Sequence, residues 1–147
     1  MNSYKRDFNC TADAIITNAL VFKSDESIQN VIELPRIYTE NAAWDTGAQF
    51  TIISHRLVKA LGLSPYGEGI VMGIGGDEKV STYMIHVGLP NGYLVSNIQA
   101  YCSDIDDYDI LIGMDIITLT DFVITNKEGK TTFLLRVPSE GCIEFHK

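Results

Sequence analysis

An alternation of apolar and polar residues with a period of two, which is typical of β-strands, constrains the fold of this 147-residue chain most. It recurs in short segments that turn residues separate. The segments predicted to be strands are 12–22, 30–38, 42–45, 49–54, 70–80, 81–89, 93–101, 110–112, a stretch from residue 122, and 131–137. The sequence therefore predicts a mainly β fold, and its length predicts one domain that spans residues 1–147.

One short helix is predicted to begin after Ser54, whose hydroxyl suits the N-cap position. Apolar residues then recur at helical spacing at Leu57, Val58 and Leu61, and Gly62 can close the helix. A second, shorter helical turn is expected just beyond residue 113. The fold should thus contain one or two short helices among its strands.

The formal net charge of −8 and the sequence pI of about 4.7 argue against nucleic acid or an anionic membrane as a partner. No apolar run approaches membrane-spanning length, and the first ten residues contain no apolar segment of the kind that directs export. The three cysteines, Cys10, Cys102 and Cys142, include no CxxC pair, which favours free, buried thiols in a reducing compartment. We therefore expect a cytoplasmic protein.

The stretch AAWDTGAQFTIIS, residues 42–54, places Asp45 between apolar segments. A carboxylate there is costly to desolvate unless another group hydrogen-bonds to it or shares its charge. Thr46 offers a hydroxyl, and Gly47 allows a sharp turn and the close approach of another chain. Asp-Thr-Gly is also an ordinary turn sequence, so this stretch by itself leaves both a structural and a catalytic role open.

Two further stretches bear on this choice. The sequence MGIGG, residues 72–76, predicts a flexible, glycine-rich hairpin tip that could cover an extended ligand. The sequence ILIGMD, residues 110–115, predicts an apolar strand that ends at a glycine. Each also fits a plain hairpin or a plain strand–helix junction, but their order and spacing relative to Asp45 favour a joint function.

Together the three stretches resemble the retropepsin-like aspartic proteases, the single-domain enzymes of retroviruses and retrotransposons and their cellular relatives. The resemblance runs from about Asp45 to Phe122 and rests on AAWDTGA, VMGIGG and DILIGMD. It implies a closed, barrel-like β fold with one or two short helices, a flap hairpin and a two-fold dimer. Residues 1 to about 40 and the last twenty or so match no motif, and the resemblance implies that they contain the first strands and dimer-forming terminal segments.

The resemblance also implies a role for each matching residue. Asp45 would be the catalytic aspartate, Thr46 would hold the two catalytic loops of a dimer together, and Gly47 would accept the substrate backbone, with Ala48 completing the loop. The flap and substrate-binding residues would be Gly73, Ile74, Gly75 and Gly76, with the N–H of Ile74 reaching the substrate through a water. The segment that supports the catalytic loop from below would be Leu111, Ile112 and Gly113.

Three positions depart from the pattern of the viral enzymes. Trp44 is bulkier than the aliphatic residue usual before the aspartate. Gln49 and Met114 stand where viral members often carry an aspartate and an arginine that pair to brace the fold. These differences bear on specificity and on whether activity is retained, and the GMD ending is more like that of retrotransposon and cellular relatives.

Aspartic protease chemistry needs two facing carboxylates that share one proton, because two such close charges do not both ionise readily. The chain contains one Asp-Thr-Gly, since Asp77, Asp115 and Asp121 stand in other sequence settings. The second carboxylate must therefore come from Asp45 of a second copy across a two-fold axis, so the hypothesis requires a homodimer that hydrolyses peptide bonds. The expected partners are a peptide or protein substrate and a second copy of the chain.

Other chemistries find less support. His55, His86 and His146 are scattered without metal-ligand spacing, and the acidic stretch 103–109 fails the EF-hand pattern, so no metal site and no cofactor are expected. Two alternatives to the enzyme stay open. One is a catalytically silent dimer of the same fold that binds peptides as a scaffold, and the other is a small-molecule or metal-binding β-barrel in which Asp45 is structural.

Overall fold

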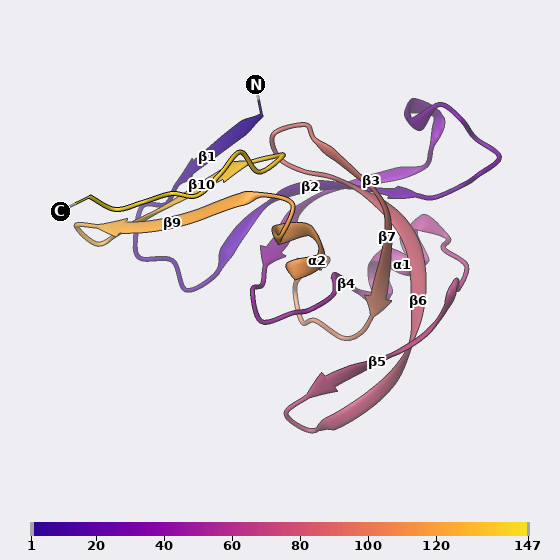
Figure 1. Ribbon diagram of the computed structural model, residues 1–147. Helices are drawn as coiled ribbons and strands as arrows, with labels where there is room; N and C mark the ends of the chain where they lie inside the picture. Colours follow the sequence, from indigo (N-terminus) through magenta and orange to yellow (C-terminus); the bar gives the residue numbers. More distant parts are fainter. Residues whose placement is uncertain (1, 147) are drawn as a thin grey trace.

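A large sheet that closes on itself forms the centre of the molecule (Figure 1). The computed structural model describes residues 2–146. Within these residues seven strands follow the order β2-β3-β8-β4-β7-β6-β5, and β2 also pairs with β6, which closes the barrel. These strands are β2 (Ile15–Lys23), β3 (Arg36–Trp44), β4 (Ile52–Ile53), β5 (Gly67–Gly73), β6 (Gly76–Gly88), β7 (Leu94–Cys102) and β8 (Ile110–Ile112).

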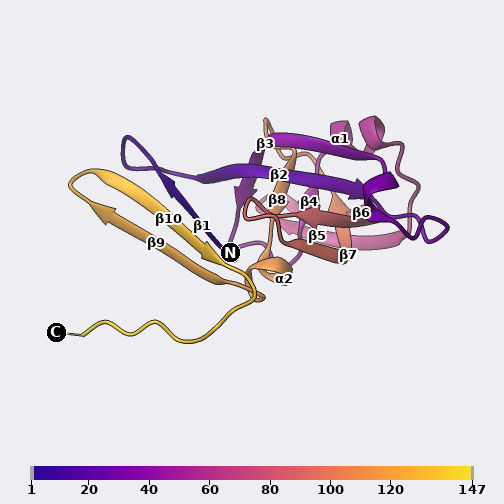
Figure 2. The same ribbon diagram turned by 90° about the horizontal axis from the view of Figure 1, so that it is seen from above.

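A second sheet projects from one side of the barrel (Figure 2). In the described part of the chain it has the strand order β1-β10-β9, all antiparallel. Its strands are β1 (Ser3–Asp7), β9 (Asp121–Lys127) and β10 (Lys130–Arg136). The N-terminal strand thus pairs with the last strand of the same chain, and the remaining C-terminal residues run beyond this sheet.

The predicted helix is confirmed as α1 (His55–Leu61). The Ser54 hydroxyl accepts a hydrogen bond from the N–H of Leu57 at 3.1 Å, and Gly62 ends the helix in the left-handed conformation, with φ of 60°. The second helical turn is α2 (Met114–Ile117). Strands account for 49% and helices for 10% of the described residues, so the mainly β fold is confirmed.

The boundaries of several predicted strands are wrong. The predicted strand 70–80 contains the hairpin turn, so that β5 ends at Gly73, and the predicted strand 81–89 is part of the longer β6, which begins at Gly76. Residues 31–33 form the 3₁₀ turn η1 (Val31–Glu33), capped by the Asn30 side chain, and β3 begins only after Pro35. Proline has no N–H to donate to a sheet, which accounts for the late start. Residues 42–44 are the end of this long β3 rather than a separate strand, and of the predicted segment 49–54 only Ile52–Ile53 is a strand. The polar strand β1 was not predicted.

Aromatic side chains join the two sheets. The Trp44 ring packs against Phe133 and Phe122, with centroids 5.4 Å and 5.8 Å apart, and Tyr4 of β1 contacts Phe133 edge-on. Trp44 is buried, and its indole N–H donates to the Thr17 hydroxyl at 2.9 Å. The bulky residue before Asp45 therefore points into the core, where it anchors the projecting sheet to the barrel.

No helix in the described residues is long and apolar enough to cross a membrane. Cys10, Cys102 and Cys142 are all free. The expectation that these thiols are buried is wrong for two of them, because Cys10 and Cys142 lie on the surface. Cys102 is buried at the end of β7, where burial and the neighbouring Glu78 raise the pKa of its thiol.

Candidate active site

The chain turns sharply where β3 ends, and we call residues 45–51 the Asp45 loop. Trp44 faces the core, whereas Asp45 is half-buried and Thr46 and Gly47 are exposed. The N–H of Asp45 donates to the carbonyl of Ile112 in β8 at 2.9 Å, which ties the start of the loop to the barrel. Asp45 is thus held by its main chain while its side chain remains accessible.

The carboxylate of Asp45 is oriented from within the loop. The N–H of Gly47 donates to Oδ1 of Asp45 at 2.8 Å, and the N–H of Ala48 donates to the Asp45 carbonyl at 3.2 Å. A Cβ at position 47 would lie 3.1 Å from the same Oδ1, so glycine allows this close turn. None of the ion pairs in residues 2–146 involves Asp45. The carboxylate can therefore face a second acidic group.

The segment from Leu111 to Gly113 lies directly against the Asp45 loop. Strand β8 runs parallel to the end of β3, with Ile112 opposite Trp44. A Cβ on Gly113 would stand 2.7 Å from the carbonyl carbon and oxygen of Phe50 and 2.9 Å from the carbonyl oxygen of Ala48. Only glycine fits this contact between two main chains, which explains the glycine at the end of the apolar strand.

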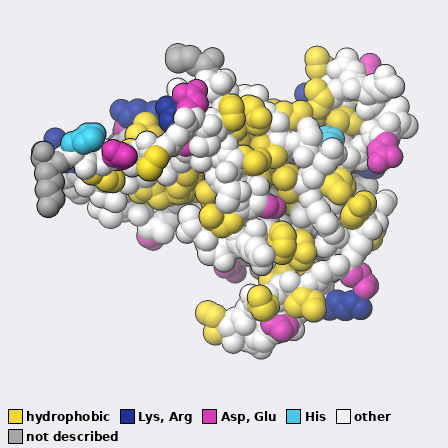
Figure 3. Space-filling view, in the orientation of Figure 1, with side chains coloured by type: hydrophobic (Ala, Val, Ile, Leu, Met, Phe, Trp, Pro, Cys, Tyr) yellow, Lys and Arg dark blue, Asp and Glu magenta, His cyan; other side chains and the backbone are white. Residues whose placement is uncertain are grey.

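Strands β5 and β6 form the predicted glycine-rich hairpin, with Gly73 opposite Gly76 and Ile74 and Gly75 at the tip. We call this hairpin the flap. Its side chains Ile70, Met72 and Ile74 are largely exposed. Figure 3 shows hydrophobic side chains at the bottom of the view, where the flap lies in Figure 1. Gly76 has a positive φ of 115°, a conformation that favours glycine. Exposed apolar residues on a projecting hairpin mark a surface that is suited to cover a ligand.

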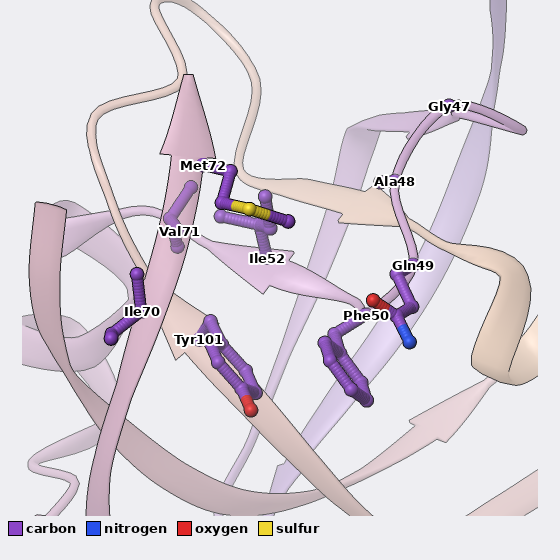
Figure 4. A pocket seen from close by; sticks show the side chains of 9 residues that line it. All are labelled: Gly47, Ala48, Gln49, Phe50, Ile52, Ile70, Val71, Met72 and Tyr101. Carbon is purple, nitrogen blue, oxygen red and sulfur yellow. The ribbon is translucent and has the colours of Figure 1, made fainter. Parts of the chain in front are cut away.

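A cavity of about 150 Å³ lies between the flap strand β5 and the Asp45 loop (Figure 4). It is lined by Gly47, Ala48, Gln49, Phe50, Ile52, Ile70, Val71, Met72 and Tyr101. The structure thus brings Gly47 and Ala48 together with the flap. The predicted flap residues 73–76 do not line this cavity, because the tip lies farther out than the adjoining residues 70–72.

Sequence reasoning missed the aromatic wall of the cavity. The rings of Phe50 and Tyr101 stack with centroids 4.9 Å apart and an angle of 4° between their planes. A Cβ on Gly69 would lie 2.3 Å from the Tyr101 ring, so the glycine lets β5 rest against that ring. Phe50 lies two residues beyond the DTGA stretch and could have been suspected, whereas Tyr101 lies in a strand that carries no motif.

The acidic stretch 103–109 is partly engaged in internal contacts. The Arg56 guanidinium pairs with Oδ1 of Asp109 at 2.7 Å, and the Thr39 hydroxyl donates to Oδ2 at 2.5 Å. Within residues 2–146, no group of three or more His, Cys, Asp or Glu residues has the geometry to hold a metal ion. Asp109 therefore joins β3, α1 and β8, which is a structural role.

A closed barrel, a flap hairpin and an aspartate loop supported by an apolar strand and glycine define the retropepsin-like class of aspartic protease folds. A family model described as "gag-polyprotein putative aspartyl protease" matches residues 39–118, and the chain belongs to this family. No curated protein has a matching sequence.

Several solved structures resemble this chain, including one from Rickettsia conorii and one from Leishmania major. The crystal structure of a retropepsin-like aspartic protease from Rickettsia conorii is 14% identical, with 90% of this chain and 91% of that chain covered and a TM-score of 0.52. The crystal structure of the retroviral protease-like domain of Ddi1 from Leishmania major is 16% identical. The match covers 84% of this chain and 95% of that chain, with a TM-score of 0.45. At this identity the Rickettsia likeness shows a shared fold, which extends well beyond the residues of the family match.

Proposed function

We propose that the protein is a homodimeric aspartic endopeptidase, in which residues 1–147 act as one domain and each chain contributes one Asp45. The observation that carries the proposal is the position of this carboxylate. It is accessible, oriented by the N–H of Gly47, and set in a loop that shares an apolar cavity with the flap. This arrangement is half of a two-carboxylate site, and a two-fold axis beside the Asp45 loop would complete it.

In such a dimer the two Asp45 carboxylates share one proton, since ionising both at short distance is unfavourable. The ionised carboxylate takes a proton from a water, and that water attacks the peptide carbonyl carbon. The protonated carboxylate donates a hydrogen bond to the carbonyl oxygen and then its proton. Collapse of the tetrahedral intermediate breaks the C–N bond. The amine takes the proton from the carboxyl group that received it from water, and a hydroxyl of the intermediate returns a proton to the other carboxylate. No cofactor enters these steps.

The substrate fits this site as an extended peptide. Exposed main-chain groups of the flap and of Gly47 can pair with a peptide backbone in the manner of an added strand. The N–H of Ile74, at the flap tip, is the candidate that reaches the substrate through a water. Thr46, exposed next to Asp45, is the candidate that joins the two loops of the dimer. A cytoplasmic site of action is part of the proposal.

The test compares wild-type protein with Asp45→Asn on a complex peptide mixture, from mildly acidic to neutral pH, with new termini read by mass spectrometry. Sedimentation establishes whether each protein is a folded dimer. We expect new termini from the wild type only, because the amide cannot act as the base. A dimeric wild type that cuts nothing would instead support a peptide-binding scaffold, and an obligatory monomer would contradict both dimeric functions.

A further inference from the structure

Thr51 and Asp115 form a two-pronged hydrogen-bonded pair between segments that lie 64 residues apart. The N–H of Thr51 donates to Oδ2 of Asp115 at 3.0 Å, and the Thr51 hydroxyl donates to Oδ1 at 2.7 Å. Oδ1 also accepts the N–H of Ile116 at 2.9 Å. Both oxygens of one carboxylate are thus used, and Thr51 is completely buried.

This carboxylate sets the direction of the Thr51 hydroxyl. An ionised carboxylate only accepts hydrogen bonds, so the hydroxyl proton must point toward Asp115. The hydroxyl oxygen is then free to accept the N–H of Gly113, which lies 3.2 Å away. The hydrogen bonds therefore form a series in which the N–H of Gly113 donates to the Thr51 hydroxyl, and this hydroxyl donates to Asp115.

This series of hydrogen bonds fixes the far end of the Asp45 loop. Asp45 begins this loop and is tied to Ile112, whereas Thr51 ends it and is tied to Asp115. Between them, the N–H of Met114 donates to the Ala48 carbonyl at 2.8 Å. The loop is thus attached to the segment 112–115 at its start, middle and end. At its end the Thr51 carbonyl also accepts the N–H of Tyr101 at 3.0 Å, but the attachment to segment 112–115 depends on the Asp115 side chain.

We propose that Asp115 is a positioning residue, which acts through Thr51 to hold the Asp45 loop where two Asp45 carboxylates can face each other. The inference rests on the proposed function. None of the ion pairs within residues 2–146 involves the Asp45 loop, and Gln49 and Met114 cannot form a charged pair. The hydrogen bonds of Asp115 to Thr51 therefore brace the loop instead. Because a displacement of about 1 Å in an active site can cost about a hundredfold in rate, the loop position bears directly on catalysis.

Asp115→Asn tests the assignment with little change in size. The amide replaces one acceptor oxygen by a donor, which must face either the N–H or the hydroxyl of Thr51. We expect kcat to fall by about tenfold to a hundredfold. The pH profile of kcat/KM should also change shape, because the two Asp45 carboxylates no longer meet at the wild-type separation. The matched control is Asp109→Asn, which alters another Thr–Asp pair away from the loop.

Thr51 variants provide a second approach that does not alter the carboxylate. Thr51→Ser keeps the hydroxyl and should keep the wild-type pH profile, whereas Thr51→Val removes it and should reproduce Asp115→Asn. The double variant Thr51→Val/Asp115→Asn should be no worse than the poorer single variant, because both substitutions break the same interaction.

Amide hydrogen exchange of the peptide that covers residues 45–51 provides a readout that needs no activity. Exchange should accelerate in Asp115→Asn and Thr51→Val but not in Asp109→Asn. An unchanged exchange rate in Asp115→Asn and Thr51→Val would overturn the proposal. So would a loss of activity that merely follows the fraction of folded dimer, with the pH profile and KM of the wild type retained. If the wild type itself cuts no peptide, the proposed function fails, and the exchange rates alone decide whether Asp115 holds the loop.

Discussion

Phe50 and Tyr101 stack almost face to face in the wall of the cavity beside the Asp45 loop, with ring centroids 4.9 Å apart. Phe50 ends the exposed part of the loop, and Tyr101 belongs to β7 and touches the flap strand at Gly69. This stack therefore links the loop to the base of the flap through one pair of aromatic rings.

Replacement of Phe50 by alanine should weaken substrate binding more than it weakens the fold. The ring is 40% exposed, so its loss leaves a shallower cavity rather than a core void. Loss of the stack with Tyr101 should cost the fold about 0.5–1.5 kcal/mol. Loss of the apolar surface of the ring, worth about 1.5–3 kcal/mol when a ligand buries it fully, should raise KM for a cleaved peptide by about tenfold or more. Steady-state kinetics measure this, with Phe50→Tyr as the control that keeps the stack. An unchanged KM in Phe50→Ala would show that the aromatic wall does not contact substrate.

Gly113→Ala should disrupt the Asp45 loop. The added Cβ would stand 2.7 Å from the main chain of Phe50, which cannot give way without moving the loop. We expect a loss of about 1–3 kcal/mol in the free energy of unfolding and about a hundredfold drop in kcat. Urea denaturation and peptide cleavage check the two effects.

Gly67→Ala is the control for this substitution, since its Cβ would meet only the Thr82 hydroxyl at 3.4 Å, an ordinary contact. Wild-type stability and activity in Gly113→Ala would disprove the close contact between Gly113 and the loop.

Thr17→Val should destabilise the join between barrel and projecting sheet. It removes the acceptor of the Trp44 indole N–H and leaves that donor buried without a partner. Such a loss costs about 1–3 kcal/mol. Because the chain has a single tryptophan, denaturation followed by Trp44 fluorescence reports on this site directly. Thr17→Ser keeps the hydroxyl and should lose less stability; equal losses in the two variants would mean that the hydrogen bond contributes little.

Asp121 should make the fold sensitive to acid. The N–H of Glu140, the Ser139 hydroxyl and the Arg136 guanidinium lower the pKa of its carboxyl from 3.8 to about 2. A carboxyl whose pKa is lower in the folded state stabilises the protein above its unfolded pKa and ceases to do so as pH falls through the folded pKa.

The stability difference between wild type and Asp121→Asn should therefore be full at neutral pH and decline between about pH 4 and about pH 2. Urea denaturation at several pH values measures it. A difference that stays constant down to pH 2 would show that these hydrogen bonds do not favour the ionised form.

Features whose cause is local were predictable from the residues. The hydroxyl of Ser54 and the conformational freedom of Gly62 act within one helix, so the ends of α1 followed from the sequence. The order of the DTGA, glycine-rich and ILIGMD stretches was enough to recognise the family, because each short stretch requires a particular local backbone conformation.

Features that depend on distant partners required the folded chain. The closing contact between β2 and β6, the pairing of β1 with β10, and the stack of Phe50 on Tyr101 each join segments that no local pattern relates. Asp115 is the sharpest case, since it looks like an ordinary first-turn helix residue until folding places Thr51, 64 positions earlier, against both of its oxygens. Periodicity reports which face of a strand is buried, but only packing chooses the partner that each buried polar group meets.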